Sequence, residues 1–129
     1  MRSMRRSGFP WTYLALLLVC GNAFGQSVKL LVQSSPLAGF QFYAGKQIWS
    51  EMKVGDRLTL VRESDNVRDS NAVRVDWRDI KLGYLPRAEN RTVATEMDRG
   101  AAVEGRIARL AEHRDPWKRL RVDVYLVLP

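Results

Sequence analysis

The segment from Asn66 to Arg87 joins a polar loop to two short strand patterns, and this combination restricts the chain to a β-rich fold. The loop, residues 66–71, is rich in Asn, Asp and Ser, whose side chains hydrogen-bond nearby backbone and favour a structured turn. Residues 72–77 then alternate apolar and charged side chains with the two-residue period of a half-buried strand. Residues 80–84 form another short strand pattern that runs into a Gly-Tyr-Leu-Pro turn. We therefore expect a rigid loop that feeds a hairpin, an arrangement suited to holding a ligand.

The remaining sequence is dominated by further strand patterns. They occupy residues 28–34, 57–62, 102–110 and 119–128, and the last of these has the clearest alternation in the chain. An extended pattern also covers residues 37–43. Many short strands separated by turn signals are typical of a small barrel or a strongly bent sheet. The predicted fold class is therefore mainly β, with about six strands in a small barrel or a strongly bent sheet.

Helical patterns are short and few. Residues 86–99 form the best of them, because proline suits a first helical turn and Gly100 is placed to end the helix. Residues 45–52 are compatible with a second short helix that buries Ile48 together with Trp49 or Met52. We therefore expect one or two short helices beside the strands.

Length and composition indicate one globular domain. A chain of 129 residues has room for one domain, and 46% hydrophobic with 27% charged residues is ordinary globular composition. The formal charge is +7, but three of the basic residues precede Gln26, which leaves 18 basic and 14 acidic residues in 26–129. A net charge of +4 permits an anionic partner without requiring one.

The N-terminus has the pattern of a secretory signal peptide. Three arginines precede an apolar run of ten residues, Trp11 to Cys20, and small residues Ala23 and Gly25 then predict cleavage before Gln26. A run of this length cannot span a hydrocarbon core, which needs about 20 residues. The alternative, a buried helix of the folded domain, fits neither the clustered arginines nor the small-residue exit. We predict a signal peptide at 1–25, a single domain at 26–129, and an exported, periplasmic or secreted protein with no membrane span after cleavage.

The position of the only cysteine agrees with an exported domain that has no disulfide. Cys20 is the only cysteine and lies inside the predicted signal, so residues 26–129 can form neither a disulfide nor a cysteine-based zinc site. The sequence around it faintly resembles a lipoprotein signal, but Val19 stands where a small residue is required, so we do not expect anchoring at Cys20. A twin-arginine signal at Arg5 and Arg6 is a further, weaker alternative.

Four motifs, in order, resemble the HIRAN domain family over about residues 32–127. The combination is fairly specific, because the polar-loop motif is followed directly by the Gly-Tyr-Leu-Pro motif. The four motifs are Gly39-Phe-Gln-Phe-Tyr43, then Gly55-Asp56-x-Leu58-x-Leu60 with Arg62-Glu63, then Asn66-x-x-Asp69-x-Asn71-Ala72-Val73-x-Val75, and then Leu82-Gly-Tyr-Leu-Pro-Arg87.

The resemblance implies a β-barrel related to the OB-fold and a binding function. In eukaryotic members the domain precedes a helicase-type ATPase and often a zinc-binding RING module, and it grips the 3′ end of single-stranded DNA. Many bacterial relatives consist of this domain alone. The ATPase and zinc functions belong to the fused modules, and this sequence has no phosphate-binding Gly-x-x-x-x-Gly-Lys-Ser/Thr motif. We therefore expect a non-enzymatic module that binds single-stranded DNA at its 3′ end, with no cofactor and no metal.

The resemblance also identifies candidate binding residues. Asp69 matches the acid that hydrogen-bonds the terminal 3′-hydroxyl, and Phe42 stands where the family has a base-stacking tyrosine. Two positions depart from the family, because Gln41 replaces a basic residue and Arg68 replaces an aromatic one. Arg68 can restore positive charge or stack through its guanidinium plane. The predicted ligand-binding residues are Phe42, Tyr43, Asn66, Arg68, Asp69, Tyr84 and Arg87.

Alternative interpretations remain open at this point. The polar loop has an equally good structural explanation, in which Asn66 and Asp69 only cap the loop's own backbone amides. A second basic–aromatic cluster at the 112–121 tip suits a polyanion or a partner protein, or is a solvated hairpin with Trp117 folded over it. Export favours an envelope protein as partner instead of DNA, so a periplasmic protein-interaction module is the second hypothesis. Because His113 is the only histidine and no nucleophile motif is present, catalysis and metal binding are not expected.

Overall fold

The computed structural model describes residues 27–129. The predicted signal peptide, its cleavage before Gln26 and the fate of Cys20 lie outside these residues and stay predictions. Within 27–129, no helix combines the length and the apolar character needed to cross a bilayer.

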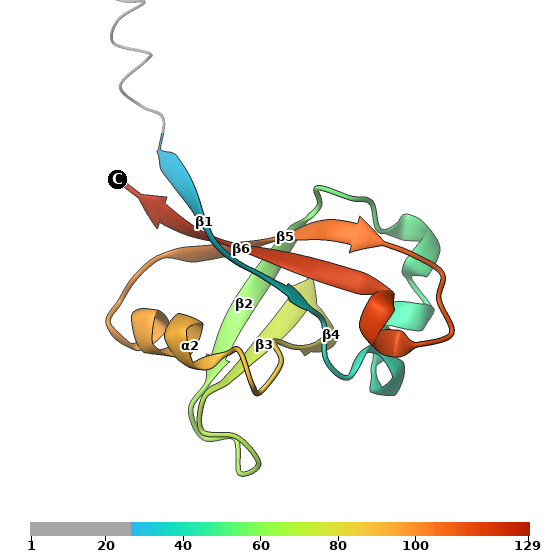
Figure 1. The fold of residues 1–129 in the computed structure, drawn as a ribbon, viewed down its shortest axis with the longest axis horizontal. Coiled ribbons are helices and arrows are strands. Elements are labelled where there is room, and N and C mark those ends of the chain that lie inside the picture. The colour runs from blue at the N-terminus through green and yellow to red at the C-terminus, as the bar shows by residue number, and fades with distance from the viewer. Residues whose placement is uncertain (1–26) are drawn as a thin grey trace, which may run out of the picture.

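The described chain folds into six antiparallel strands in one sheet, which confirms the mainly β prediction (Figure 1). The hydrogen-bonded order is β1-β6-β5-β2-β3-β4. The strands are β1 (Val28–Pro36), β2 (Arg57–Glu63), β3 (Ala72–Trp77), β4 (Ile80–Tyr84), β5 (Val103–Leu110) and β6 (Leu120–Leu128).

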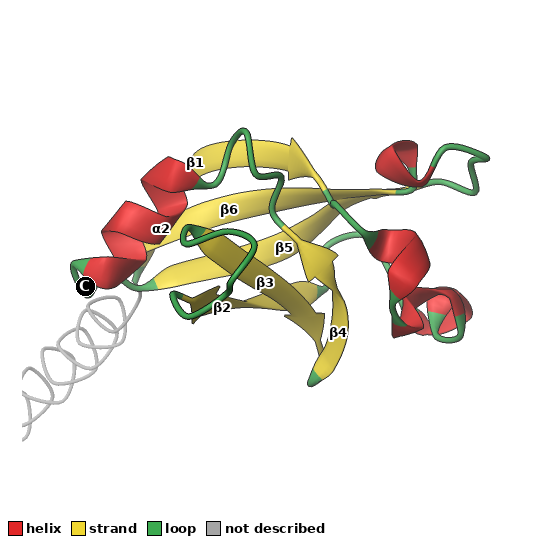
Figure 2. Ribbon diagram, turned by 90° about the horizontal axis from the view of Figure 1, so that it is seen from below, coloured by secondary structure: helices red, strands yellow, loops and turns green. Residues whose placement is uncertain are grey.

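The sheet bends at one narrow junction into a barrel-like shape. Only Arg57 and Leu58 of β2 pair with β5, and Gly105 of β5 allows this close approach, since a Cβ there would lie 3.1 Å from the Leu58 Cβ. The bend brings the two ends of the sheet together (Figure 2). Beyond β1, Ala38 donates its amide to the Tyr84 carbonyl at 2.9 Å and accepts the Tyr84 amide at 3.0 Å. This single bridge joins the sheet ends, although the strand ladder itself is not closed.

The core lies between the two halves of the bent sheet. Leu58, Val75 and Val124 come from different strands and are all fully buried, as their alternation predicts. The helix α2 (Arg91–Asp98) and a group of short 3-10 turns lie at opposite ends of the molecule (Figure 1). The buried apolar residues are Leu37, Phe40, Met52, Leu58, Leu60, Ala72, Val73, Val75, Trp77, Leu82, Leu85, Val93, Ala94, Ile107, Leu120, Val122 and Val124.

The outer strand β1 begins with exposed apolar side chains. Val28, Leu30, Leu31 and Val32 are each at least half exposed, and β1 is an edge strand of the sheet. An exposed apolar edge strand is a template on which another chain can add a strand.

The predicted helix at 86–99 is shorter than expected. Residues 86–89 form a turn in which the Glu89 amide donates to the Pro86 carbonyl at 2.9 Å, and α2 begins only after Asn90. The reason is tertiary, because the Asn90 side chain is buried and donates to Asp69 in the polar loop instead of continuing a helix. The end of the helix agrees with the prediction, since Gly100 adopts a left-handed φ of 88°.

The segments 37–43 and 45–52 are corrected to 3-10 turns. Gly39, with φ 79°, turns the chain out of the extended path into η1 (Phe40–Phe42). Two more turns, η2 (Ala44–Lys46) and η3 (Trp49–Glu51), replace the predicted second helix, and η4 (Pro116–Lys118) lies at the 112–121 tip. Gly45 packs flat against the Phe40 ring, where a Cβ would lie 2.2 Å from a ring carbon. Packing around Phe40 therefore outweighs the weak helical pattern.

Candidate binding cleft

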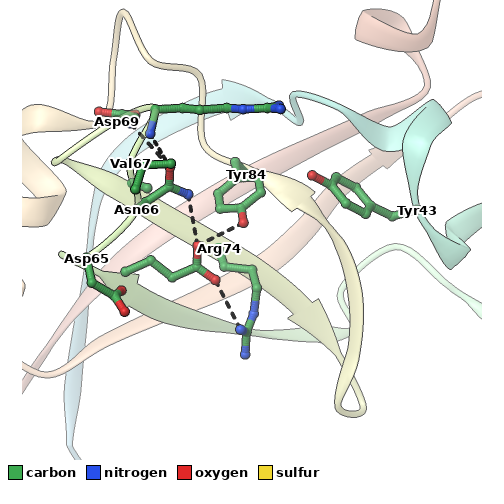
Figure 3. Close-up of a pocket in the computed structure, with 10 residues that line it drawn as sticks. Tyr43, Asp65, Asn66, Val67, Asp69, Arg74 and Tyr84 are labelled. Carbon is green, nitrogen blue, oxygen red and sulfur yellow. Dashed lines mark hydrogen bonds and ion pairs between the residues drawn. The ribbon is translucent and has the colours of Figure 1, made fainter.

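The polar loop, β3, β4 and the turn after η1 enclose a cleft of about 760 Å³ (Figure 3). Five of the seven predicted binding residues line it, namely Tyr43, Asn66, Arg68, Asp69 and Tyr84. Phe42 and Arg87 lie outside its lining. The residues that line the cleft and were not predicted are Glu63, Asp65, Val67, Ala72 and Arg74.

The polar loop is held by its own side chains. The Asn66 Oδ1 accepts hydrogen bonds from the Arg68 amide at 2.9 Å and the Asp69 amide at 3.2 Å. The Asp69 Oδ1 accepts from the Asn71 amide at 3.0 Å. These bonds span two or three residues, so the loop sequence specifies its own turn. Asn66 and Asp69 therefore do cap backbone amides of the loop.

Contacts from outside the loop fix its position over the cleft. The Asp69 Oδ2 accepts from the Asn90 Nδ2 at 2.7 Å, so both Asp69 carboxylate oxygens have partners. Arg62 donates to the Ser70 carbonyl at 2.8 Å and the Ala72 carbonyl at 3.1 Å. The Arg87 guanidinium donates to the Arg68 carbonyl, so this predicted ligand-binding residue is bonded to the loop backbone. A ligand that reaches Asp69 must share its carboxylate through the lone pairs that remain.

Glu63 is the centre of the cleft's hydrogen bonds. Its Oε1 accepts from the Tyr84 hydroxyl at 2.8 Å and the Asn66 Nδ2 at 3.1 Å, and its Oε2 accepts from the Arg74 Nη1 at 3.1 Å. Burial raises the pKa of Glu63, but the three hydrogen bonds outweigh it and leave the pKa below its ordinary value. Glu63 therefore joins the loop, β3 and β4 through one ionised carboxylate.

The ionised Glu63 should make stability depend on pH. A lowered folded-state pKa stabilises the fold above the ordinary value of about 4.3, and this contribution is lost as pH falls through the folded-state pKa. We expect Glu63→Gln to cost about 1 kcal/mol at pH 6, because a neutral amide has one acceptor oxygen in place of two and loses the ion pair with Arg74. Urea denaturation at pH 6 and pH 3 should show a smaller loss on acidification for the variant than for the wild type. Equal losses for the two proteins would contradict this role of Glu63.

Two tyrosines form an aromatic wall beside the loop. The Tyr43 and Tyr84 rings meet edge to face, with centroids 6.1 Å apart and planes at 62°. The Lys81 Nζ lies 4.2 Å from the Tyr43 ring centroid and 4.7 Å from that of Tyr84. Burial lowers the pKa of Lys81, but the two tyrosines outweigh it and leave the pKa above its ordinary value. Lys81 is therefore a charged ammonium that lies against the two tyrosine rings. The register of the β3–β4 hairpin places it there.

Arg74 is committed to carboxylates on both sides. Its Nε and Nη2 donate to Asp76 at 2.9 Å each, while its Nη1 reaches Glu63. The hydrogen bond to Asp76 raises the pKa of Arg74 further. Its charge is therefore balanced inside the protein. Arg68 is exposed and has no ion pair within residues 27–129, so it is the cleft-lining arginine that can meet an anion.

The cleft thus combines an aromatic wall, the exposed Arg68 and a rigid hydrogen-bonding loop, and Lys81 lies against the wall without being part of the cleft lining. Phe42 is 76% exposed and follows Phe40 in η1, directly before Tyr43, so it adds an aromatic surface next to the cleft in the chain. Within residues 27–129, no group of three or more His, Cys, Asp or Glu side chains is arranged to hold a metal ion. Glu63 at the end of β2 and Lys81 in β4 were not among the predicted binding residues.

Comparison with known proteins identifies the family. A sequence model of the HIRAN domain matches residues 30–129. No curated protein sequence matches the chain. A crystal structure of a protein from Lactobacillus plantarum is 26% identical, with a TM-score of 0.70, and the match covers 81% of this chain and 100% of that one. The crystal structure of the HIRAN domain of human HLTF is 20% identical, with a TM-score of 0.58, covering 81% of this chain and 79% of that one. The family match spans most of the chain, so this protein belongs to the HIRAN domain family.

Proposed function

We propose that the cleft binds the 3′ end of a single-stranded nucleic acid without catalysing a reaction. The observation that carries the proposal is the Tyr43–Tyr84 wall, with Lys81 against it, facing the rigid loop that presents Asp69. Stacking of bases on aromatic rings beside cations is how proteins bind single strands with little sequence preference. Family membership supports this class of ligand.

Each part of the cleft has a role in this proposal. A terminal base stacks on the tyrosine wall, and the phosphate that follows it meets Lys81 or Arg68. The terminal hydroxyl donates to the Asp69 carboxylate, which has lone pairs left beside its bonds to Asn71 and Asn90. A terminal phosphate would instead bring negative charge against Asp69. The cleft therefore distinguishes a free 3′-hydroxyl from a 3′-phosphate.

The carboxylates of the cleft favour binding over catalysis. Glu63 accepts three hydrogen bonds and has a lowered pKa, which makes it a poor general base at neutral pH. Asp69 is tied to the loop and to Asn90 on its two oxygens. The hydrogen bonds of these two carboxylates form without a ligand, so the cleft has its shape before binding.

The test is binding of the purified protein to labelled single-stranded oligonucleotides over a salt series. We expect binding to weaken with salt, with a slope of log K against log salt of about −1.4 if two phosphates are contacted. A 3′-hydroxyl oligonucleotide should bind about tenfold more tightly than its 3′-phosphate counterpart, and Asp69→Asn should reduce that preference. Asp65→Asn is the matched control, because Asp65 is an exposed cleft residue outside the loop's hydrogen bonds.

Two results would overturn the proposal. One is the absence of binding at low salt. The other is binding that Asp69→Asn and Asp65→Asn change equally. Absence of binding would favour the second hypothesis, a protein-interaction module, for which the exposed apolar beginning of β1 is the supporting observation.

A further inference from the structure

A second pocket lies between the 3-10 turns and the β5–β6 tip. Its volume is about 320 Å³, and its walls come from two parts of the chain that are far apart in sequence. The turns η1 and η4 are in contact there, which places the 112–121 tip against the start of the domain (Figure 1). The pocket is lined by Phe40, Lys46, Trp49, Glu112, His113 and Arg119.

The aromatic side of this pocket is rigid. Phe40 is buried and meets Trp49 edge to face, with ring centroids 5.6 Å apart and planes at 77°. Gly45 packs against the Phe40 ring, where a Cβ would lie 2.2 Å from a ring carbon. Trp49 is only partly buried, so it can offer ring surface to a ligand. The pocket therefore contains a fixed aromatic platform.

The other side of the pocket carries uncompensated positive charge. The Arg119 guanidinium donates to the His113 carbonyl at 2.7 Å and the Arg114 carbonyl at 3.3 Å, so its charge has no carboxylate partner. Lys46 is exposed and forms no ion pair within residues 27–129. Of the residues that line the pocket, Lys46 and Arg119 are basic and Glu112 is acidic. At the same tip, Trp117 is 49% exposed.

The short turns connect this pocket to the binding cleft. Tyr43 lines the cleft, while Phe40 and Lys46, three residues away on either side, line the second pocket. The exposed Phe42 ring lies next to Tyr43 in the chain, in the same turn as Phe40. Residues three apart in a chain lie within about 11 Å of each other, so a strand of a few nucleotides is long enough to reach from the Tyr43 wall to the second pocket.

We propose that the second pocket binds nucleotides that lie upstream of the terminal one on the same single strand. This inference rests on the proposed function and extends it. A base stacks on Trp49, and the phosphates beside it meet Lys46 and Arg119. Mixed aromatic and cationic lining suits a nucleic-acid strand better than an apolar peptide. The protein thus has a footprint longer than the terminal nucleotide alone.

The test is the dependence of affinity on oligonucleotide length. The full chain is titrated with 3′-hydroxyl oligonucleotides of two, four and eight nucleotides at low salt. We expect the eight-nucleotide strand to bind about tenfold more tightly than the dinucleotide, which is the effect of one additional stacked base. Lys46→Glu should remove most of this gain, leave dinucleotide affinity unchanged and lower the salt slope for the long strand by about 0.7.

Control variants separate this inference from its alternatives. Arg99→Glu makes the same change of charge sign at the C-cap of α2, which lies at the opposite end of the molecule, and should leave the length dependence intact (Figure 1). Trp49→Leu should reduce the gain without changing the salt slope. Two results would overturn the second pocket: no gain in affinity with oligonucleotide length, or a gain that Lys46→Glu and Arg99→Glu reduce equally. In either case, binding of the dinucleotide would still support the cleft. Failure of every oligonucleotide to bind would instead overturn both proposals.

Discussion

Replacing Gly83 with alanine should destabilise the fold by about 3 kcal/mol, at the upper end of what overpacking costs. A Cβ at Gly83 would lie 2.3 Å from the Ala38 carbonyl oxygen and 3.2 Å from the Leu37 Cγ. The same carbonyl accepts the Tyr84 amide at 3.0 Å in the bridge that joins the two ends of the sheet. The Ala38 carbonyl belongs to the backbone and cannot rotate away from the new Cβ as a side chain could, so the Ala38–Tyr84 bridge must open. Urea denaturation at neutral pH measures the loss.

Gly100→Ala is the matched control for this prediction. Gly100 also has a positive φ, 88°, but a Cβ there would have nothing within 4 Å. Its alanine variant should therefore lose only the conformational cost of about 1 kcal/mol. A Gly83→Ala loss no larger than that of Gly100→Ala would show that the bridge does not hold the sheet ends together.

Tyr43→Ala should weaken binding of a 3′-hydroxyl oligonucleotide by ten- to a hundredfold. A stacked base contributes about 1–3 kcal/mol, and each 1.4 kcal/mol is a factor of ten in affinity. Tyr43 is only partly buried and lies on a turn, so its truncation should cost the fold little. The substitution also removes one cation–π contact of Lys81, whose ammonium lies 4.2 Å from the Tyr43 ring centroid. Fluorescence anisotropy at fixed salt measures the effect.

Tyr43→Phe separates stacking from hydrogen bonding. Phenylalanine keeps the ring and its face, so the variant should bind within about threefold of the wild type. Equal losses for Tyr43→Phe and Tyr43→Ala would assign the effect to the hydroxyl and contradict the stacking wall. Unchanged binding in Tyr43→Ala would place the bound base elsewhere.

The strands and the loop turn were predictable because their signals are local. Alternation in residues 72–77 and 119–128 reports which side of a strand faces the core, and both strands form there. Asn66 and Asp69 bond to amides two or three residues away, so their caps follow from sequence alone. The weak signals failed where distant packing competed with them, as Phe40 does with the predicted helix at 45–52.

Local sequence signals could not predict which residues meet in the cleft. Glu63 meets Arg74 and Tyr84 across separations of 11 and 21 residues, and the register of the β2-β3-β4 sheet decides that meeting. Asn90 was expected inside a helix, but its bond to Asp69 fixes the helix start instead. A sequence pattern reports that a residue is polar and half-buried, but it does not report the partner.

The sequence by itself determined the β-rich fold, the capped loop and, through its four motifs, membership of the HIRAN domain family. Tertiary structure alone decided how Lys81 lies against Tyr43 and Tyr84, how Glu63 joins the loop to the hairpin, and how the tip closes a second pocket against Phe40. The physical reason is that strand formation and capping depend on neighbours along the chain. A binding surface depends on side chains that only the bend of the sheet and the Ala38–Tyr84 bridge bring together.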